Sequence, residues 1–207
     1  MAQAPSPQPV LRPGDVPERI VIEGLLLRRW QAGDREARYR TILASFDHLH
    51  AWMDWADNPP TEHQDAERLK KALNWPSDRS YNFAIFDELE QTILGMAAIH
   101  DSLGGKAVEI GYWCHVDHVG RGVITRSARA LTQLLLGLDQ LARVEIRCDE
   151  ANVRSAAVAR RLGYRLDRIE EDGITAPVES GRGMVWVKEC LTDPSARWAI
   201  RAAAGAC

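Results

Sequence analysis

A glycine turn between a strand pattern and a helix pattern is the feature of this sequence best suited to chemistry. Apolar and polar residues alternate over residues 108–115, Gly120-Arg121-Gly122 follows, and apolar residues then recur at helical spacing as far as Leu138. A helix N-terminus leaves backbone N–H groups unpaired, its dipole adds partial positive charge, and glycine lets an anion approach closely. The turn therefore predicts a cradle for a phosphate or pyrophosphate. The alternative is a turn in which glycine only relieves backbone strain.

The place of this turn in the chain argues against two common nucleotide sites. It lacks the Gly-Lys-Ser or Gly-Lys-Thr ending of a loop that binds a nucleoside triphosphate. It also follows four predicted strands, with no preceding strand–helix–strand unit of the kind that opens a dinucleotide-binding fold. These features argue against a nucleotide-dependent dehydrogenase.

The elements that must position the turn form a mixed α/β pattern. We predict a strand over residues 19–30 with a bend or hairpin at Gly24, a helix over 34–46 with Asp34 as N-cap, and a helix over 61–73 that opens on a capping box at Thr61. Further strands are predicted over residues 82–86, 92–100, 109–115, 143–148, 164–171 and 184–190, and further helices over 123–138 and 152–162. This pattern predicts a mixed, mostly antiparallel sheet of about six to seven strands with helices on both faces.

A single domain accounts for most of the 207 residues. We predict that it spans residues 19–192. Residues 1–18 contain five prolines and little to bury, which predicts a flexible leader. Residues 193–207 are predicted to be a C-terminal tail with helical potential.

Composition excludes several classes of partner. The net charge is −3, which argues against a nucleic-acid binder, and no apolar run approaches the length of a membrane span. Four scattered cysteines without a CxxC pair argue against a disulfide framework or a zinc site and favour a reducing, cytoplasmic compartment. His48 and His50 have no further cluster of ligands beside them, so we predict no metal.

Glu109 is a carboxylate on the predicted strand that leads into the glycine turn, and such a group can act as a general base. Strand alternation places it on the same face as Gly111, Trp113 and His115. A carboxylate that only forms an ion pair on the strand is the equally weighted alternative. His115 and His118 are rival bases because histidine titrates near neutral pH, although each fits a packing or loop role better.

Trp52 and Trp55 are spaced to share one face of a helical turn. Aromatic rings of this kind either pack in a core or form the wall of a binding cleft. With Trp113, they are the candidate substrate-binding residues. The acidic segment that includes Glu170, Glu171 and residues 172–183 would suit a positively charged ligand, although a charge run is more often a solvated face.

Several motifs together resemble the GNAT superfamily of acyl-CoA N-acyltransferases, and most closely its branch of RimJ/RimL ribosomal-protein N-terminal acetyltransferases. The motifs are EIGYW at 109–113, the turn VGRGVI at 119–124, Asn152-x-x-Ser155, ARRLGY at 159–164 and HLHAWMDW at 48–55. The turn departs from the superfamily pattern Q/R-x-x-G-x-G/A at Val119 and Ile124, of which the second departure is common in this branch. The resemblance covers roughly residues 21–190.

The resemblance implies a GNAT-like fold in which the sheet splays into a central V and binds an acyl-CoA, most often acetyl-CoA. The pyrophosphate would lie on the turn, and the pantetheine arm would pair with the splayed strand like an added strand. The residues that this implies for cofactor binding are Cys114, His115, Val116, Gly120, Arg121, Gly122, Val123, Ile124, Thr125, Asn152 and Ser155.

The resemblance also implies direct acyl transfer to a primary amine. Many members protonate the CoA thiolate with a tyrosine at the position of Ala159, whereas this branch has a serine at the position of Ser155, so the resemblance implies Ser155 as the candidate acid. The superfamily often has an acidic residue on the strand before the turn that deprotonates the amine through water, which implies Glu109 as the candidate base. The acceptor is either a protein N-terminal amine or a small-molecule amine, and the donor acetyl-CoA or succinyl-CoA. The other hypothesis is a non-catalytic CoA-binding sensor. No nucleic acid or membrane partner is expected, and either a monomer or a homodimer fits.

Overall fold

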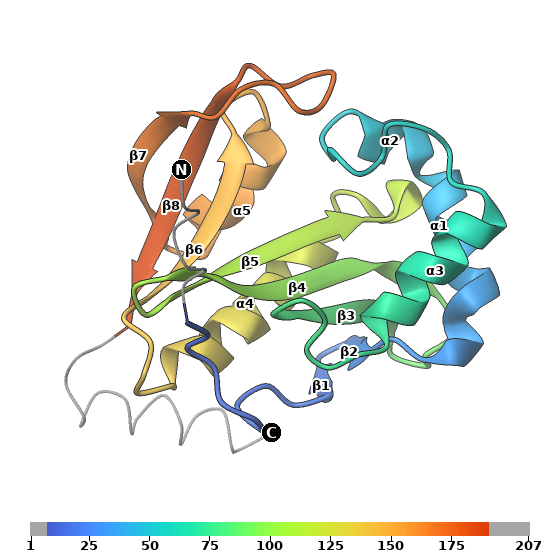
Figure 1. Ribbon diagram of the computed structural model, residues 1–207, viewed down its shortest axis with the longest axis horizontal. Helices are drawn as coiled ribbons and strands as arrows, with labels where there is room; N and C mark the ends of the chain where they lie inside the picture. Colours follow the sequence, from blue (N-terminus) through green and yellow to red (C-terminus); the bar gives the residue numbers. More distant parts are fainter. Residues whose placement is uncertain (1–7, 191–207) are drawn as a thin grey trace, which may run out of the picture.

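The computed structural model describes residues 8–190, which form one eight-stranded sheet with helices on both faces (Figure 1). The strand order is β1-β2-β3-β4-β5-β6-β8-β7. Every neighbouring pair is antiparallel except β5–β6, which is parallel, so the predicted mixed, mostly antiparallel sheet is confirmed. The strands are β1 Arg19–Ile22, β2 Leu25–Arg29, β3 Ser80–Asp87, β4 Ile93–Gly104, β5 Ala107–Cys114, β6 Arg143–Asp149, β7 Arg165–Glu171 and β8 Arg182–Glu189.

The predicted first strand is two strands, which raises the strand count above the expected six to seven. Gly24 has a φ of +67°, a left-handed conformation that suits glycine, and it closes a hairpin in which Ile22 pairs with Leu25. The apolar run therefore folds back on itself instead of continuing as one extended segment.

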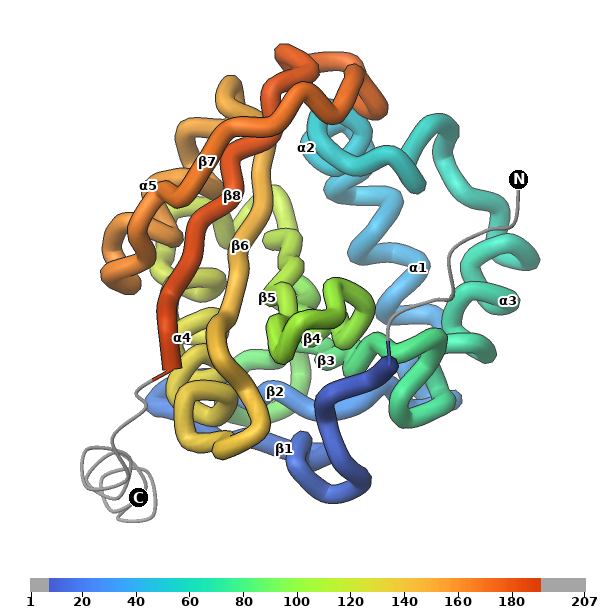
Figure 2. The backbone as a smooth tube through the Cα atoms, turned by 60° about the vertical axis from the view of Figure 1, so that its left-hand side comes forward, coloured from blue at the N-terminus to red at the C-terminus, as the bar shows by residue number. Residues whose placement is uncertain are grey.

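Three helices, α1 Arg35–Ala44, α2 Phe46–His50 and α3 Glu62–Ala72, cover one face of the sheet (Figures 1 and 2). Thr61 forms the predicted capping box with Gln64 at the start of α3. The predicted helix over 34–46 is divided at Ser45 into α1 and α2. Asp34 makes no side-chain cap to α1, because its carboxylate instead accepts hydrogen bonds from Arg28 at 2.8 and 2.7 Å.

The opposite face carries α4 Val123–Leu136 and α5 Val153–Arg161. The largest hydrophobic cluster lies between these helices and the sheet, and Leu131 and Leu135 of α4 are fully buried in it. Two short 3-10 helices, Ala32–Asp34 and Val116–His118, precede α1 and α4. None of the helices within residues 8–190 is long and apolar enough to cross a membrane.

The sheet divides between β5 and β6. These strands pair only from Ala107 to Glu109 and from Arg143 to Glu145, and then diverge. Figure 2 shows β6, β7 and β8 turning away from the rest of the sheet. The central V-shaped splay that the resemblance implied is therefore present, and the N-terminal ends of α4 and α5 lie beside it.

Part of the expected leader packs on the fold. Leu11 and Val16 are buried, and the backbone N–H groups of Val10 and Leu11 donate to the carboxylate of Asp101. The expectation that this segment buries little was therefore wrong for residues 10–16, since a few apolar side chains among the prolines are enough to fill the edge of the core. Residues 1–7 of the leader and the predicted tail over 193–207 lie outside the described residues.

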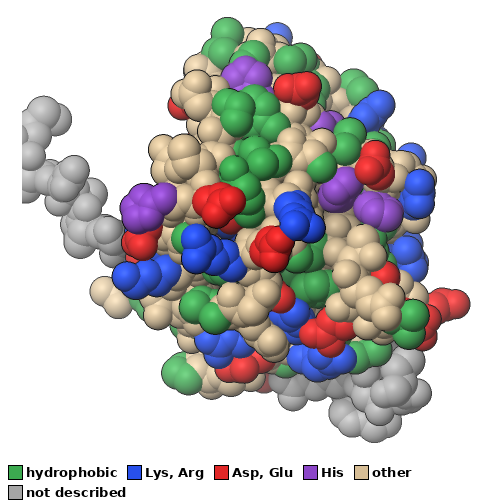
Figure 3. Space-filling view, turned by 90° about the vertical axis from the view of Figure 1, so that its right-hand side faces the viewer, with side chains coloured by type: hydrophobic (Ala, Val, Ile, Leu, Met, Phe, Trp, Pro, Cys, Tyr) green, Lys and Arg blue, Asp and Glu red, His purple; other side chains and the backbone are tan. Residues whose placement is uncertain are grey.

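The face seen in Figure 3 carries acidic and basic side chains interspersed with one another. On this face there is accordingly no basic stripe of the kind that nucleic-acid binding requires.

Candidate active site

A cleft of about 1560 Å³ opens at the splay between β5 and β6. Its walls come from both halves of the sheet, from α2 and the segment after it, and from the first turns of α4 and α5. Most of the predicted site residues line it: Trp52, Trp55, Glu109, Trp113, Cys114, residues 120–125, Asn152 and Ser155. His115 and Val116 are not among the lining residues.

The glycine turn forms one end of the cleft. Gly120 and Gly122 have φ angles of +80° and +76°, and a Cβ added to either would meet no atom within 4 Å. Gly122 is the N-cap of α4, and the amide of Arg126 is the first to donate back into the helix, to Gly122 O at 3.0 Å. The amides of residues 123–125 therefore precede the helical hydrogen bonds and adjoin open space, which is the geometry of an anion cradle.

Four arginine side chains from the turn and the helices line the cleft. Arg121 and Arg126 come from the turn and α4, and Arg154 and Arg161 come from α5. Arg126 also donates to the carbonyl of Glu23 at 2.8 Å, which joins α4 to the β1–β2 hairpin. Arg121 and Arg126 flank the unpaired amides in the chain, and guanidinium groups so placed favour a ligand that carries phosphate charges.

The edge of β5 that faces the splay offers backbone groups to a ligand. The amide of His115 donates to Leu94 O on the β4 side, at 2.9 Å. Because successive residues of a strand turn their N–H and C=O groups to opposite neighbours, Tyr112 and Cys114 present theirs toward the splay. This edge can pair with an extended ligand, as the resemblance implied for Cys114.

His115 and Val116 lie differently from the expectation. The amide of His115 is used by β4, and the amide of Val116 donates to Ser45 Oγ at 3.1 Å. Strand alternation could not reveal this, because the chain leaves the sheet after Cys114 and enters a 3-10 helix whose N-cap is His115. His118 lines the cleft near the glycine turn, with its ring 5.3 Å from that of His115.

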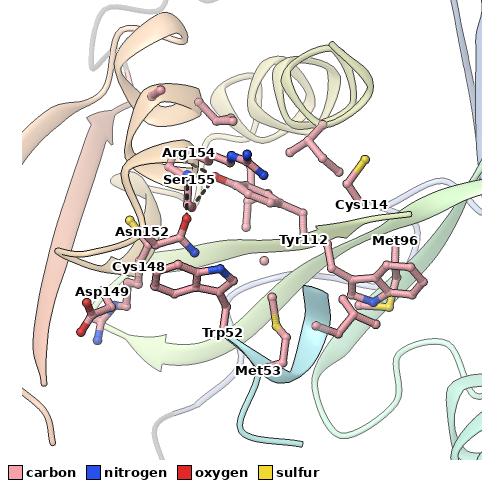
Figure 4. A pocket seen from close by; sticks show the side chains of 18 of the residues that line it. Trp52, Met53, Met96, Tyr112, Cys114, Cys148, Asp149, Asn152, Arg154 and Ser155 are labelled. Atoms are coloured by element: carbon pink, nitrogen blue, oxygen red, sulfur yellow. Dashed lines mark hydrogen bonds between the residues drawn. The ribbon is translucent and has the colours of Figure 1, made fainter. Parts of the chain in front are cut away.

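Ser155 and Asn152 lie at the N-terminus of α5, on the wall opposite β5. Asn152 is the N-cap, and its Oδ1 accepts from the amide of Ser155 at 3.0 Å. The Ser155 hydroxyl is 3.0 Å from the hydroxyl of Tyr112, which reaches across the splay from β5 (Figure 4). Burial raises the pKa of Tyr112, so its phenol stays protonated and can donate.

Tyr112 is a site residue that the sequence reasoning missed. Alternation had placed it on the face of β5 opposite Glu109, and that face packs against α4 and α5. The signal was therefore available in the EIGYW motif, but the partner on α5 is 43 residues away in the chain.

Glu109 lines the other face of the cleft, on the side that holds Gly111 and Trp113. Burial raises the pKa of this carboxyl, and the guanidinium of Arg147 opposes the shift. Arg147 Nε lies 4.0 Å from Glu109 Oε2, and the same guanidinium pairs with Glu145 at 2.8 Å and with Glu170 at 3.8 Å. Glu109 is thus a carboxylate held in a network of charged groups, and its pKa is higher than that of a free glutamate.

Aromatic side chains form the wall opposite α5. Trp52 projects toward Asn152 and Cys148 (Figure 4). Trp113 is buried and packs in a cluster with Ile42 and Leu49, so it combines a core role with a place in the cleft lining. Trp55 is partly buried, and the guanidinium of Arg68 lies 5.6 Å from the centre of its ring.

The segment between β7 and β8 closes the end of the cleft that lies away from the glycine turn. Asp149 holds it by accepting from the amides of Ser180 and Gly181, each at 3.0 Å. The amide of Val178 then donates to Ala51 O at 3.2 Å, which joins the segment to α2 across the opening. Three acidic residues of this region line the cleft: Glu170, Asp172 and Glu179. The cleft is therefore basic at the glycine turn and acidic at the other end.

No group of three or more His, Cys, Asp or Glu side chains within residues 8–190 is arranged to hold a metal ion. The sequence reasoning also missed His100, which lines the cleft from β4. It lies directly opposite Glu109 in the β4–β5 pairing, a relationship that depends on the register of the hairpin.

Comparisons with known proteins agree with this geometry. A family model for the acetyltransferase (GNAT) domain matches residues 24–165. The "Putative ribosomal N-acetyltransferase YdaF" of Bacillus subtilis (strain 168) is 28% identical over 162 residues, which cover 74% of this chain and 85% of that protein. The ribosomal-protein-serine acetyltransferase of Escherichia coli (strain K12) is 30% identical over 122 residues, which cover 48% of this chain and 66% of that protein.

Solved structures share the fold. RimL, a ribosomal L7/L12 alpha-N-protein acetyltransferase crystallised with coenzyme A, superposes with a TM-score of 0.74 at 20% identity, over 84% of this chain and 98% of that one. The microcin C7 self-immunity acetyltransferase MccE, crystallised with acetyl-CoA and AMP, also gives a TM-score of 0.74. It is 19% identical, and the match covers 86% of this chain and 99% of that one.

Proposed function

The chain belongs to the GNAT acetyltransferase family, and on that premise we propose that it transfers an acetyl group from acetyl-CoA to a primary amine by direct attack, with a peptide N-terminal amine as the preferred acceptor. The observation that carries the proposal is the open glycine cradle at Gly120 and Gly122, separated by a splayed strand edge from Ser155 on the facing helix. This arrangement matches the three parts of an acyl-CoA: its phosphates, its pantetheine arm and its thioester.

The donor substrate would lie along the cleft. Its pyrophosphate would accept hydrogen bonds from the amides of residues 122–125, and Arg121, Arg126, Arg154 and Arg161 would neutralise its charge. Its pantetheine amides would pair with the free backbone groups of Tyr112 and Cys114. Asn152 would hydrogen-bond the arm with its side-chain NH₂ group, because its oxygen already caps α5.

The chain's own groups would then move protons and stabilise charge. Glu109 would accept a proton from the amine, directly or through one water. The amide of Cys114 would donate to the carbonyl oxygen as it gains negative charge. Ser155, with Tyr112 donating to it, would supply a proton to the departing sulfur. Transfer is direct, and no covalent bond to the enzyme is needed.

The acceptor end favours an amine that arrives as a cation. Glu109, Glu170, Asp172 and Glu179 line this end and outnumber Arg147, so they attract an ammonium group. The names of the relatives point to ribosomal-protein N-termini, which supports a peptide acceptor. A small-molecule amine is the second candidate, because Trp52 and Trp55 provide aromatic faces beside the acidic groups.

The first experiment is a thermal-shift panel with acetyl-CoA, succinyl-CoA, NAD and ATP. A ligand present at 100 times its dissociation constant stabilises the protein by about 2.7 kcal/mol, so we expect a clear upward shift with acetyl-CoA and none with NAD. Stabilisation by NAD but not by any CoA ester would overturn the proposal in favour of a dehydrogenase.

The second experiment is an acceptor screen that measures thiol release and confirms products by mass. The panel contains short peptides with free N-terminal serine or alanine, the same peptides blocked at the N-terminus, and small diamines. We expect turnover with free peptides and none with blocked ones. Tight acetyl-CoA binding without transfer to any amine would instead indicate a non-catalytic CoA-binding protein.

A further inference from the structure

His100 is a buried histidine of the cleft that the proposed proton transfers do not use. It lies on β4 and pairs in register with Ser80 on β3 and with Glu109 on β5, so all three side chains share one face of the sheet. The Nδ1 atom of His100 is 2.7 Å from Ser80 Oγ. One ring nitrogen is thus engaged by a neutral hydroxyl, and the other is available for another partner.

The free ring nitrogen points over β5. A Cβ added to Gly111 would lie only 2.8 Å from His100 Nε2, so the imidazole occupies the space that any other residue at position 111 would fill. Both His100 and Gly111 line the cleft. The glycine of the EIGYW motif therefore makes room for the imidazole beside Glu109, on the side where the acceptor would enter.

The surroundings of His100 keep it neutral. Burial lowers its pKa, and its partner Ser80 carries no charge that would favour the imidazolium. Glu109 pairs with His100 across β4 and β5, and Arg147 on β6 lies 4.0 Å from the Glu109 carboxylate, so these two charged groups share the cleft wall with the imidazole. When Nδ1–H donates to Ser80 Oγ, Nε2 carries a lone pair directed to the cleft, which is the form needed to accept a proton.

The overall reaction requires a second proton acceptor, and the Nε2 lone pair of His100 could serve as one. An acceptor that arrives as R–NH₃⁺ leaves as R–NH–CO–CH₃, so its nitrogen loses two protons while one N–C bond forms and the C–S bond of the thioester breaks. One proton ends on the CoA sulfur, and the other must leave to solvent. The proposed site, with Glu109 as its only base, has one acceptor for two protons.

We propose that His100 is the second proton acceptor of this site, with Nε2 taking a proton from the ammonium form of the acceptor and Ser80 fixing the tautomer that makes this possible. The proposal rests on the acetyl transfer proposed above. His100 takes the proton that goes to solvent and returns to the neutral form after each turnover. Glu109 takes the proton lost as the amide forms, and that proton then replaces, through water, the one that Ser155 gives to the sulfur.

The kinetic test compares His100→Gln, Glu109→Gln and the control His63→Gln, whose side chain is exposed on α3. The best peptide of the acceptor screen is the probe. We expect His100→Gln to lower kcat/KM by about 100-fold with acetyl-CoA affinity unchanged, and His63→Gln to change neither. In a plot of log(kcat/KM) against pH, the slope on the acidic side should be one unit smaller for His100→Gln than for the wild type. Added imidazole should restore part of the activity of a His100→Gly variant but not of Glu109→Gln.

The second test does not depend on turnover. Long-range ¹H–¹⁵N spectra of the ¹⁵N-histidine-labelled protein, with His100 assigned from the variant, should show the Nδ1–H tautomer at pH 7, and Ser80→Ala should change the tautomer ratio.

The Nε2–H tautomer in the wild type would overturn the proposal, as would unchanged kcat/KM and acidic-side slope in His100→Gln. Wild-type protein that binds acetyl-CoA but acetylates no amine would instead refute the proposed function, and this proposal with it.

Discussion

The hydroxyl of Tyr112 on β5 lies 3.0 Å from Oγ of Ser155 on α5, and this contact joins the two halves of the splayed sheet across the cleft. Only one of the two hydroxyls can donate to the other, and the raised pKa of Tyr112 keeps its proton in place over the whole working range of pH. Tyr112 is therefore suited to donate to Ser155, and Ser155 to donate its own proton onward into the cleft. A serine alone is a poor acid, whereas a serine that accepts a hydrogen bond from a phenol gives up its proton more readily.

This pair predicts graded losses on substitution. Ser155→Ala removes the group proposed to protonate the departing sulfur and should lower kcat by about 100-fold, while Tyr112→Phe leaves the serine in place and should lower kcat by about 10-fold. Thiol release measures kcat, and calorimetry measures acetyl-CoA affinity, which should change less than threefold in both variants.

Ser127→Ala is the matched control for the serine substitution. Ser127 is on α4, and its hydroxyl is buried without a hydrogen-bond partner, so its loss should affect neither kcat nor stability adversely. If Ser155→Ala kept wild-type kcat, Ser155 would have no part in protonating the sulfur.

The glycine cradle predicts a difference between two strained glycines. Gly122 and Gly105 both have left-handed φ angles, +76° and +58°, and neither has an atom within 4 Å of an added Cβ. Alanine at either position should destabilise the fold by about 1–2 kcal/mol, measured by urea unfolding. Only Gly122→Ala should weaken acetyl-CoA binding, by about 10-fold, because only its Cβ would enter the phosphate cradle. Equal affinities of the two variants would place the phosphates elsewhere.

The fold was largely predictable because its signals are local. Strand alternation and helical periodicity are properties of short segments, and the capping box at Thr61 and the bend at Gly24 are both encoded within a few residues. The exceptions have non-local causes. Asp34 was expected to cap a helix, but Arg28 on β2 draws its carboxylate into a buried ion pair. Leu11 is buried in the main hydrophobic cluster, where Asp101, 90 residues later, accepts its backbone N–H.

The candidate site was predictable in its parts but not in its connections. The glycine turn and the Asn152-x-x-Ser155 motif can be recognised in the sequence alone, and both line one cleft in the structure. The pairing of Tyr112 with Ser155, and of His100 with Ser80, depends on which strands become neighbours and in what register. No single segment contains that information.

Glu109 predicts a pH dependence of catalysis. Burial raises its pKa above the ordinary value of 4.5, and Arg147 holds the shift in check. Since the base must be ionised, kcat/KM should fall as the pH drops through this raised pKa. Arg147→Gln removes the opposing charge and should move that limb to higher pH, while Glu145 keeps its contact with Arg143 at 2.7 Å. If the acidic side of the kcat/KM profile stays at the same pH in Arg147→Gln, then the ionisation of Glu109 does not determine it.

The same shift affects stability with a defined sign. The folded protein holds a proton on Glu109 at pH values where the unfolded chain has released it, so this residue makes stability fall as the pH rises from the ordinary pKa through the raised one. Glu109→Gln removes this decline. Thermal unfolding of the wild type and the variant at several pH values measures the difference.

Asp149 predicts a link between loop order and acceptor binding. Its carboxylate accepts from the amides of Ala151 at 2.8 Å and of Ser180 and Gly181 at 3.0 Å. Burial acts to raise its pKa, but the hydrogen bonds from Ser180 and Ala151 outweigh burial and hold the pKa below the ordinary 3.8. Its stabilisation is therefore complete above that ordinary value and is lost as the pH falls through the lowered pKa. Asp149→Asn keeps the shape but replaces one acceptor oxygen with a donor, so it should cost about 1–3 kcal/mol at pH 7.

The functional effect of Asp149→Asn should fall on the acceptor rather than on acetyl-CoA. The residues that Asp149 holds precede β8 and follow Val178, whose amide reaches Ala51 across the cleft. Loosening them should raise the KM for the peptide by about 10-fold and leave the KM for acetyl-CoA within twofold, since about 1.4 kcal/mol corresponds to a tenfold change in affinity. Asp167→Asn on the exposed strand β7 removes a carboxylate paired with Arg165 and Arg168 and is the matched control, expected to change neither value. Equal rises in both KM values would mean that Asp149 supports the cleft as a whole, and no rise in either would mean that this segment takes no part in acceptor binding.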